Sequence, residues 1–541
     1  MAPKRSSHTF LHWPLTLAGT LSLGVLLGAT LFGHPTGQDK VAQNISRIQE
    51  VLAYIRHDYA DAVDVDALGQ SAIEGMLDRL DPHSAYILPQ DLKMANAPLE
   101  ENFDGIGIEF VLLHDTIQVV TPIAGGPSDK VGILAGDRIL RVDGDAVAGV
   151  RISNAAVFDK LRGPRQSSVK LEVARPGVAQ GLVFNLKRDR IPTKSVEGGV
   201  MLDKRTGYIK ITRFAGGTDK EFEAMLDQLL RKGANRLVLD LRDNPGGYLE
   251  KAISIADHFL PEGATITYTK GQAAKYSQTY KASAKGSFQD GALAVLINEG
   301  SASAAEILAG ALQDNDRASV IGRRSFGKGL VQMPITLSDG AELRLTISRY
   351  YTPSGRCIQK PYDSHDLAQY DDDLDERLRH GELFFEDSIR GQDTVRYQTA
   401  RGRTVHGGGG IRPDVFVPVD TAANPALLAR VEGRYILAGH ASAYAALHKA
   451  IWQKAGFPAF KARFQMEQAT VASIKARAAA EGIRASEAQW AAVLPAMAHA
   501  YKAAAARAIF GEAGYYAIAT EQDTDIARAR AAFAAPLARQ P

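Results

Sequence analysis

Short strand-like runs alternate with longer helix-like runs between residues 188 and 420 of this chain. The strand-like runs include TGYIKI (206–211) and RLVLDLR (236–242), and the helix-like runs include DKEFEAMLDQLLRKG (219–233) and YLEKAISIADHFL (248–260). Parallel strands need a crossover, usually a helix, to bring the chain back to the start of the next strand. The alternation therefore predicts an α/β core over residues 188–420.

The rest of the chain follows other patterns, and 541 residues are too many for one hydrophobic core. Residues 36–97 have apolar residues at three-and-four spacing, which predicts helices. Residues 98–187 have a period of two, with turns near His114-Asp115 and Asp143-Gly144, which predicts a mainly-β domain. Residues 421–541 are rich in alanine and other strong helix formers. We therefore predict a multidomain α/β protein with an N-terminal helical segment, an inserted mainly-β domain and a helical C-terminal extension.

A polar segment near residues 364–400 interrupts the predicted core. It contains YDDDLDERLR (370–379), whose carboxylates do not have the spacing of a calcium-binding loop. We interpret this segment as a solvated excursion from the core.

The N-terminus, residues 1–35, predicts a signal peptide or a signal anchor. Lys4 and Arg5 precede an uncharged run, LTLAGTLSLGVLLGATLFG, from Leu15 to Gly33. The residues after this run fit a cleavage site poorly, so an uncleaved anchor is favoured. We expect the protein to be exported to the periplasmic side of the cell envelope and tethered to the cytoplasmic membrane.

Composition argues against several function classes. A net charge of +2 gives no reason to expect nucleic acid as a partner. The single cysteine, Cys357, cannot form an intramolecular disulfide, and it is a weak candidate for a catalytic thiol. His83, in the turn DPHSAYILP, is interpreted as a structural residue and not as a ligand. Neither a metal nor another cofactor is expected.

The stretch GRRSFGKGLVQ, residues 322–332, resembles a phosphate-binding loop at three positions. Gly322, Gly327 and Lys328 match, but Gly329 stands where the hydroxyl that binds Mg²⁺ would be needed. The strand that precedes this stretch is also short. A phosphate loop is therefore disfavoured, and the lysine needs another explanation.

Two serines precede this lysine at a predicted junction of strand and helix. Ser301 and Ser303 follow the apolar run LAVLI (293–297), and the next residues predict a helix. A serine hydroxyl is a weak nucleophile unless a base takes its proton. No histidine lies nearby, so Lys328 is the candidate base. Lowering a lysine pKa from about 10.4 to about 7 requires roughly 4–5 kcal/mol, which burial can supply.

Together these stretches resemble the carboxy-terminal processing peptidases, also called tail-specific proteases. The five matching motifs occur in the family's order over about residues 40–420, and they read DLRDNPGGYL, GSASAAE, FGKGLVQ, YYTPSGRCIQ and GIRPD. The resemblance implies an exported serine endopeptidase with a Ser–Lys dyad. It does not cover the polar insert or the C-terminal extension.

The resemblance also implies a role for each site residue. Ser303 would be the nucleophile, Lys328 the base and Gln332 the residue that orients Lys328. The N–H of Ala304 and that of either Gly246 or Gly247 would form the oxyanion hole.

The mainly-β domain is similar to a PDZ domain, most clearly in GGPSDKVGILAGDRILRVDG (125–144). The similarity implies that Gly105, Ile106, Gly107 and Ile108 form a loop that binds the carboxylate of a polypeptide substrate. Ile106 and Ile108 would border a pocket for an apolar C-terminal side chain.

We therefore predict a serine endopeptidase that recognises substrate C-termini and cleaves through an acyl-enzyme. Two alternatives are a PDZ scaffold with an inactive peptidase core and a P-loop nucleotide hydrolase. Natural substrates and homo-oligomerisation remain open at this point.

Overall fold

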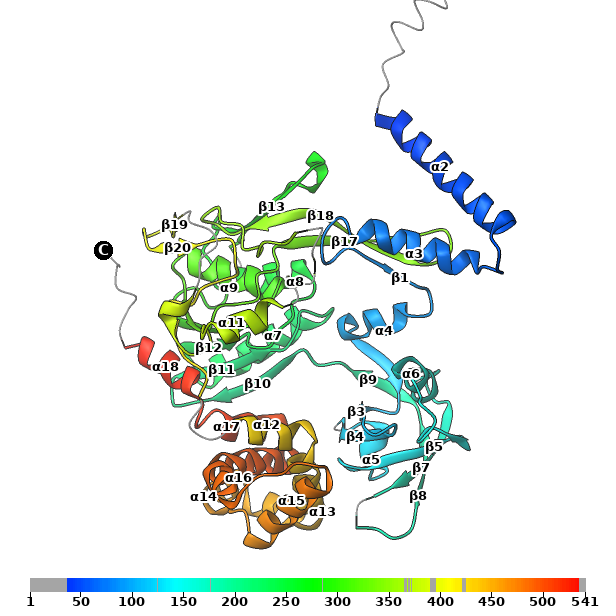
Figure 1. The fold of residues 1–541 in the computed structure, drawn as a ribbon. Coiled ribbons are helices and arrows are strands. Elements are labelled where there is room, and N and C mark those ends of the chain that lie inside the picture. The colour runs from blue at the N-terminus through cyan, green and yellow to red at the C-terminus, as the bar shows by residue number, and fades with distance from the viewer. Residues whose placement is uncertain are drawn as a thin grey trace, which may run out of the picture. The chain divides into compact units, whose positions relative to one another are not determined.

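The computed structural model describes residues 37–534, except for residues 124, 176, 285, 364–366, 368, 369, 371, 390–395 and 421–424. The chain divides into two compact units, residues 1–76 and 77–541. The first unit contains helix α2 (Gly37–Asp58) and almost all of helix α3 (Val65–Leu77) (Figure 1).

The mainly-β domain is a six-stranded antiparallel sheet with the order β3-β4-β5-β7-β8, and β6 pairs with β5. Its elements are β3 (Ile108–Leu112), β4 (Ile117–Pro122), α5 (Pro127–Lys130), β5 (Arg138–Val142), β6 (Asp145–Ala146), α6 (Asn154–Leu161), β7 (Ser168–Ala174) and β8 (Leu182–Lys187). Alternate side chains of these strands, such as Ile117, Val119 and Ile139, are fully buried in one core. Left-handed residues at His114-Asp115 and Asp143-Gly144 confirm both predicted turns.

Strand β3 forms one edge of this sheet. Among the described strands it pairs only with β4, so its other side offers unpaired N–H and C=O groups to an extended peptide. A short ribbon of β2 (Asn102–Gly105) and β9 (Asp189–Pro192) connects this domain to the rest of the chain.

The α/β core contains a second six-stranded sheet with the order β10-β11-β12-β15-β16-β21. The five strands from β11 to β21 are parallel, as the alternation of the sequence predicts, and β10 is antiparallel to β11. The strands are β10 (Val196–Met201), β11 (Thr206–Ile211), β12 (Arg236–Asp240), β15 (Ala292–Ile297), β16 (Ser319–Gly322) and β21 (Val415–Phe416).

Helices cover both faces of this sheet. Leu237, Leu239 and Val295 share one core with helices α7 (Thr218–Arg231), α8 (Leu249–Asp257) and α9 (Ala304–Asp314). Their neighbours Val238, Ala294 and Leu296 point to the opposite face, because successive side chains of a strand alternate. Helices α17 (Glu512–Ala519) and α18 (Thr524–Ala532) of the C-terminal extension cover that face.

A smaller antiparallel sheet has the order β1-β18-β13-β14, and β17 also pairs with β18. The strands are β1 (Ala85–Ile87), β13 (Thr265–Gly271), β14 (Thr279–Lys281), β17 (Leu330–Thr336) and β18 (Glu342–Tyr351). The sequence predicts a helical segment over residues 36–97 with a turn at DPHSAYILP, and the structure adds the short strand β1 directly after that turn. Asp81 accepts hydrogen bonds from the N–H groups of His83 and Ser84, which fixes a turn and sends the chain into a strand.

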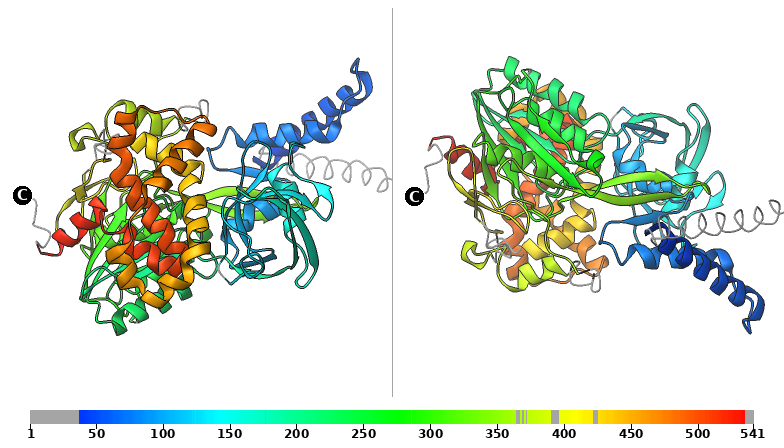
Figure 2. Two further views of the ribbon diagram at one scale, coloured as in Figure 1. Left: turned by 90° about the horizontal axis from the view of Figure 1, so that it is seen from below. Right: turned by 90° about the horizontal axis from the view of Figure 1, so that it is seen from above.

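The remaining helices of the extension pack around a core of their own. They are α12 (Pro425–Gly433), α13 (Ile436–Ala455), α14 (Phe457–Arg463), α15 (Gln468–Ala480) and α16 (Glu487–Phe510), drawn in yellow-orange to red in the two views of Figure 2. The other short elements are α4 (Leu92–Asn96), η1 (Ala97–Leu99), η2 (Ala274–Tyr276), α11 (Asp373–Arg379), η3 (Glu386–Ser388), β19 (Arg396–Gln398) and β20 (Thr404–His406). The predicted fold class is confirmed: helical segments at both ends, an inserted mainly-β domain and an α/β core.

The polar insert is not simply a solvated excursion. Arg377 of α11 is only 4% exposed, and its Nε donates to Glu382 at 2.9 Å. Glu382 also accepts a hydrogen bond from the Nε of Arg324 at 2.6 Å. One carboxylate therefore joins the insert to the segment that follows β16. The charges of the insert are therefore partly neutralised inside the protein, which a pattern of polar residues does not reveal.

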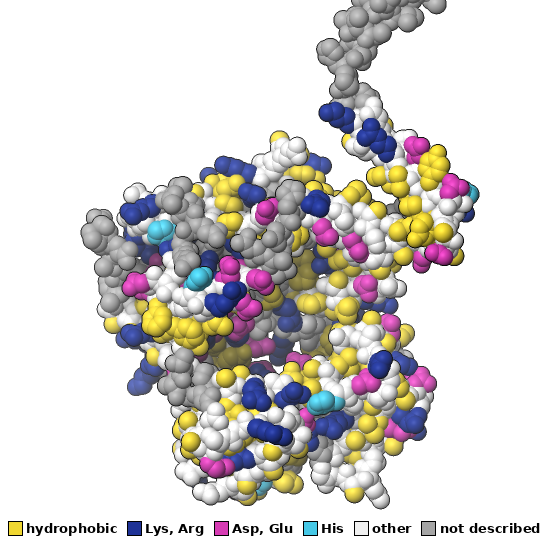
Figure 3. All heavy atoms as spheres, in the orientation of Figure 1, with side chains coloured by type: hydrophobic (Ala, Val, Ile, Leu, Met, Phe, Trp, Pro, Cys, Tyr) yellow, Lys and Arg dark blue, Asp and Glu magenta, His cyan; other side chains and the backbone are white. Residues whose placement is uncertain are grey.

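Positive and negative side chains are interspersed on the face of the protein drawn in Figure 3. Within the described part of the chain, no helix has both the length and the apolar character to cross a membrane. The uncharged run from Leu15 to Gly33 lies outside the described residues.

Candidate active site

Ser303 lies where strand β15 gives way to helix α9. It is the residue immediately before the first helical residue, Ala304, and its backbone has φ 54° and ψ −115°. A residue with a side chain held in such a sparsely populated conformation stores on the order of 1–3 kcal/mol, and such strain concentrates at functional sites. The helix start also turns N–H groups toward whatever binds beside Ser303.

The two serines of this turn have different surroundings. Ser301 is fully buried, its Oγ donates to the carbonyl of Leu241 at 2.8 Å, and it accepts from the N–H of Asn298 at 3.0 Å. Ser303 is partly exposed. Only the Ser303 hydroxyl can therefore meet a substrate, and Ser301 holds the turn together.

Lys328 lies two residues before strand β17, and Gln332 is near the start of that strand. The Lys328 Nζ donates to the Oε1 of Gln332 at 3.0 Å, and the Gln332 Nε2 donates to the carbonyl of His83. The pairing of β17 with β18 shifts register between Val331 and Gln332, and such bulges redirect side chains. Gln332 thus fixes the Lys328 amine from one side.

The electrostatics of the Lys328 amine suit a base. Burial lowers the pKa of Lys328 from its ordinary value; the negative charge of Asp81 opposes this shift, and the positive charge of Arg344 adds to it. Burial, with the positive charge of Lys328, also lowers the pKa of His83 to about 4, so His83 is neutral at physiological pH. A lysine with a lowered pKa populates the neutral amine that can accept a proton.

Glu306, in the first turn of α9, joins the serine to the lysine. This fully buried carboxylate accepts four hydrogen bonds, from the Ser303 N–H (2.8 Å), the Ser325 Oγ (2.6 Å), the Gly327 N–H (2.7 Å) and the Lys328 N–H (2.9 Å). Burial raises the pKa of Glu306 to about 7, and these hydrogen bonds limit that rise because they favour the charged form.

Tyr350 of strand β18 makes a second connection between the same two residues. Its hydroxyl lies within hydrogen-bonding distance of the carbonyl of Ser303, at 3.0 Å, and of the carbonyl of Lys328. The backbones of Ser303 and Lys328 are thus held through both their N–H and their C=O groups. Within the described residues no hydrogen bond joins the Ser303 hydroxyl to the Lys328 amine, so it is the main chain that brings the pair together.

The hydrogen bonds of this loop argue against a phosphate site. In a phosphate-binding loop, successive backbone N–H groups point at phosphate oxygens. Here the N–H groups of Gly327 and Lys328 donate to Glu306, whose negative charge would repel a phosphate. The resemblance of Gly322–Lys328 to such a loop is therefore confined to the sequence.

The turn after strand β12 packs directly against Ser303. A Cβ atom on Gly246 would lie 2.7 Å from the Ser303 Cβ, and one on Gly247 would lie 2.2 Å from the Phe214 carbonyl oxygen, so both positions require glycine. The Gly246 N–H donates to the Oδ1 of Asn244 at 2.8 Å. Within the described residues, the N–H groups of Gly247 and Ala304 have no acceptor. These two are the donors that a substrate oxygen can still use.

Both isoleucines of the loop from Gly105 to Ile108 are buried. Ile106 and Ile108 are 2% and 8% exposed and pack in the core of the mainly-β domain. Gly107 has φ 73°, and its N–H has no acceptor in the part of the chain that the structure describes. The loop can therefore offer backbone N–H groups to an anion, while its side chains support the domain.

Three residues of this site are not apparent from the sequence: Glu306, Tyr350 and His83. Glu306 has a detectable signal, because a serine followed three residues later by glutamate is a helix-start pattern. Tyr350 and the carbonyl of His83 have no such signal. His83 lies in a turn, as the sequence indicates, but its carbonyl also holds Gln332.

Two protein-family models and several known proteins match this chain. A model described as "Peptidase family S41" matches residues 205–366, and one described as "PDZ domain" matches residues 105–185. A carboxy-terminal-processing protease of Bartonella bacilliformis is 37% identical over 345 residues, which cover 62% of this chain and 78% of the relative. Carboxy-terminal processing protease CtpA of Bacillus subtilis is 34% identical over 348 residues, covering 64% of this chain and 72% of the relative.

Among solved structures, a photosystem II D1 C-terminal processing protease is 26% identical, and the match covers 68% of this chain and 86% of that one, with a TM-score of 0.36.

Proposed function

The chain belongs to the carboxy-terminal processing proteases of peptidase family S41 and is a serine-type peptidase with a PDZ domain, and we propose that it cleaves polypeptides through a Ser303–Lys328 dyad and an acyl-enzyme. The main observation that supports this proposal is that the backbones of Ser303 and Lys328 share the same two hydrogen-bonding partners. One carboxylate, of Glu306, binds the N–H groups of both, and one hydroxyl, of Tyr350, lies against the carbonyls of both.

The proposed reaction uses four groups of this chain. The Ser303 Oγ attacks the carbonyl carbon of the scissile bond while the neutral Lys328 Nζ takes the hydroxyl proton. The N–H groups of Gly247 and Ala304 stabilise the resulting oxyanion. Lys328 then gives its proton to the leaving amine as the C–N bond breaks, which leaves an ester on Ser303. Lys328 then takes a proton from a water molecule, whose oxygen attacks the ester carbon. As the ester C–O bond breaks, Lys328 gives this proton to the Ser303 Oγ, which releases the new carboxyl terminus and restores both residues.

Gln332 has a positioning role in this scheme. Its Oε1 accepts one hydrogen of the Lys328 amine, and its own amide is held by the carbonyl of His83. This hydrogen bond restricts the rotation of the lysine side chain, so less entropy is lost when the amine approaches Ser303.

We propose that the PDZ domain selects substrates by their C-termini. The free edge of β3 can add a peptide strand, and the N–H of Gly107 lies in the loop that would receive the terminal carboxylate. We also propose that the protein is exported and tethered to the cytoplasmic membrane. This rests on Lys4, Arg5 and the uncharged run that follows them.

The pH dependence of cleavage tests the proposed base. Neutral Lys328 is the active form, and burial lowers its pKa, so kcat/KM should rise with pH through that lowered pKa and fall on the acidic side. Protonation of Glu306, whose pKa is about 7, acts in the same direction because a neutral carboxyl group accepts hydrogen bonds more weakly. The measurement is kcat/KM for one peptide from about pH 5 to about pH 9, with and without EDTA. A flat profile, or inhibition by EDTA, would contradict the mechanism.

A comparison of peptides tests C-terminal selection. Amidation of a good substrate removes the charge that backbone N–H groups would bind. Because such charge-assisted hydrogen bonds contribute roughly 1.5–3 kcal/mol each, kcat/KM should fall by at least about tenfold. The set comprises peptides that end in acid or amide, each with an apolar or a charged last residue. Equal kcat/KM values for all four would show that substrate ends are not recognised.

A further inference from the structure

Two helices of the C-terminal extension complete the core of the peptidase. One face of the central sheet, with Val238, Ala294 and Leu296, packs against Ile526 and Ala529 of α18. Figure 1 shows α18 beside this sheet, although some 280 residues separate it from β12 along the chain. Helix α18 is therefore a structural layer of the catalytic unit.

The first turn of α18 forms an ion cluster with Arg242. The Arg242 guanidinium donates to the Asp523 carboxylate at 2.8 and 3.2 Å and to the Asp525 carboxylate at 2.8 Å. Its remaining hydrogen bonds go to Asp240, at 2.6 to 3.2 Å. The side chains of these four residues are between 0% and 21% exposed, so solvent screens the cluster only weakly.

Arg242 lies immediately before the turn that packs against Ser303. Its N–H donates to the Asp240 Oδ1 at 2.9 Å, and its carbonyl accepts from the Lys210 Nζ at 3.0 Å. The next residue, Asp243, is left-handed with φ 61°, and the turn continues through Asn244 to the glycines. The position of Arg242 therefore determines where this turn begins.

The carboxylates of Asp523 and Asp525 also place negative charge around Arg242, so that three carboxylates face two cations. Lys210 and Arg242 are two cations beside the single buried carboxylate of Asp240, whose Oδ2 lies 3.9 Å from the Lys210 Nζ. Without Asp523 and Asp525, one cation in excess would remain in a weakly screened site. The guanidinium would then be drawn toward solvent, together with the backbone that carries it.

We propose that α18 is a positioning element of the active site: Asp523 and Asp525 hold Arg242 and thereby fix the turn that carries the Gly247 N–H. The inference rests on the proposed function, in which that N–H stabilises the oxyanion. In this account Asp523 and Asp525 act through Arg242, which they bind directly.

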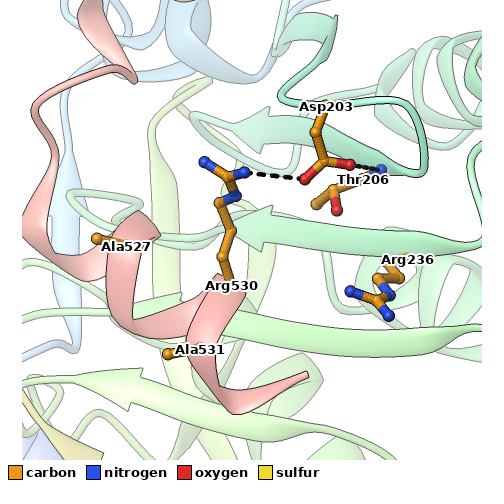
Figure 4. A pocket seen from close by; sticks show the side chains of 6 residues that line it. All are labelled: Asp203, Thr206, Arg236, Ala527, Arg530 and Ala531. Carbon is orange, nitrogen blue, oxygen red and sulfur yellow. Dashed lines mark hydrogen bonds and ion pairs between the residues drawn. The ribbon is translucent and has the colours of Figure 1, made fainter. Parts of the chain in front are cut away.

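A second anchor of α18 provides a matched control. At the other end of the helix, Arg530 donates to Asp203 at 3.1 Å beside a small pocket that Thr206 and Arg236 also line (Figure 4). This ion pair attaches the same helix to the same sheet at the start of the strands, away from the Ser303 turn. Removing this ion pair weakens the attachment of the helix and leaves the contacts of Arg242 unchanged.

The experiment uses the full chain with Asp523→Asn and Asp525→Asn combined. Asparagine at position 523 can still accept from the Ile526 N–H, so the helix cap is retained. We expect kcat to fall by about 10- to 100-fold, because small displacements of a preorganised oxyanion donor have effects of this size. KM should change by less than about twofold, because the N–H acts on the transition state. Arg530→Gln should leave kcat unchanged.

A double-mutant cycle makes the test specific. Arg242→Lys should lower kcat to a similar extent. The triple variant, which combines it with the two Asp→Asn changes, should have a kcat only slightly lower still, because all three substitutions disrupt the same ion cluster. If the double variant unfolds, Asp525→Asn alone is measured and should lose about tenfold in kcat.

Unchanged kcat in folded variants, or equal losses in Arg530→Gln, would overturn the inference while wild-type cleavage still supports the proposed function. A wild-type chain without peptidase activity would overturn both.

Discussion

Replacing either Ser303 or Lys328 with alanine is expected to lower kcat/KM by about 10⁴-fold or more while the protein stays folded. In the proposed mechanism both residues act in one proton-transfer step, so the double variant should be hardly slower than either single one. Steady-state kinetics on one peptide, with thermal unfolding of each variant, provides the measurement. Additive losses in the double variant would mean that the two residues do not act together.

Lys328→Arg is the matched control for charge and length. A guanidinium stays protonated at every accessible pH and cannot take a proton from Ser303. This variant should therefore be as inactive as Lys328→Ala. Robust cleavage by Lys328→Arg would show that the residue supports structure and is not the base.

Glu306→Gln is expected to lower kcat/KM by about 100-fold, which is the effect of displacing reacting groups by about 1 Å. All the groups around Glu306 are donors, apart from the Ser325 hydroxyl, which can also accept. An amide has one oxygen, so its NH₂ group must face at least one N–H of Ser303, Gly327 or Lys328. Each donor left without a partner costs about 1–3 kcal/mol, and the backbones of the two proposed catalytic residues lose their common anchor.

Asp314→Asn is the control for Glu306→Gln. Asp314 lies on the same helix, is almost fully buried, and pairs with Arg356 at 2.7 Å. Its neutralisation should lower the unfolding temperature but leave kcat/KM near that of the wild type. Equal kinetic losses in both variants would mean that Glu306 matters only for stability.

The sequence predicts the architecture well because the architecture follows from the local periodicity of apolar residues. The alternation over residues 188–420 specifies a parallel sheet, and the turn residues at Asp143-Gly144 specify a hairpin in the mainly-β domain. The junction that exposes Ser303 was also predictable, because a buried apolar run ends there and a helix begins.

Other parts of the site depend on contacts between distant residues. The carbonyl of His83 holds Gln332 across 249 positions, and any residue could supply a carbonyl there. Asp523 and Asp525 belong to an alanine-rich segment in which they look like ordinary helix-start residues. The insert looked solvated because its buried arginine, Arg377, has its partner Glu382 outside the acidic run.

The choice between Gly246 and Gly247 could not be made from the sequence either. Both glycines lie in one turn, and only the structure shows that the Gly246 N–H is occupied by Asn244. The burial of Ile106 and Ile108 is a further property that only the structure shows. Their alternation with glycine fits a binding loop, and both side chains lie in the core of the domain.

The most direct test of the central claim is the digestion of an unfolded protein by residues 36–541. The wild-type chain is compared with Ser303→Ala and with Ser301→Ala under identical conditions. Our account predicts cleavage by the wild type, no cleavage by Ser303→Ala, and cleavage by any Ser301→Ala protein that remains folded. Full activity in Ser303→Ala, with loss only in Ser301→Ala, would contradict it.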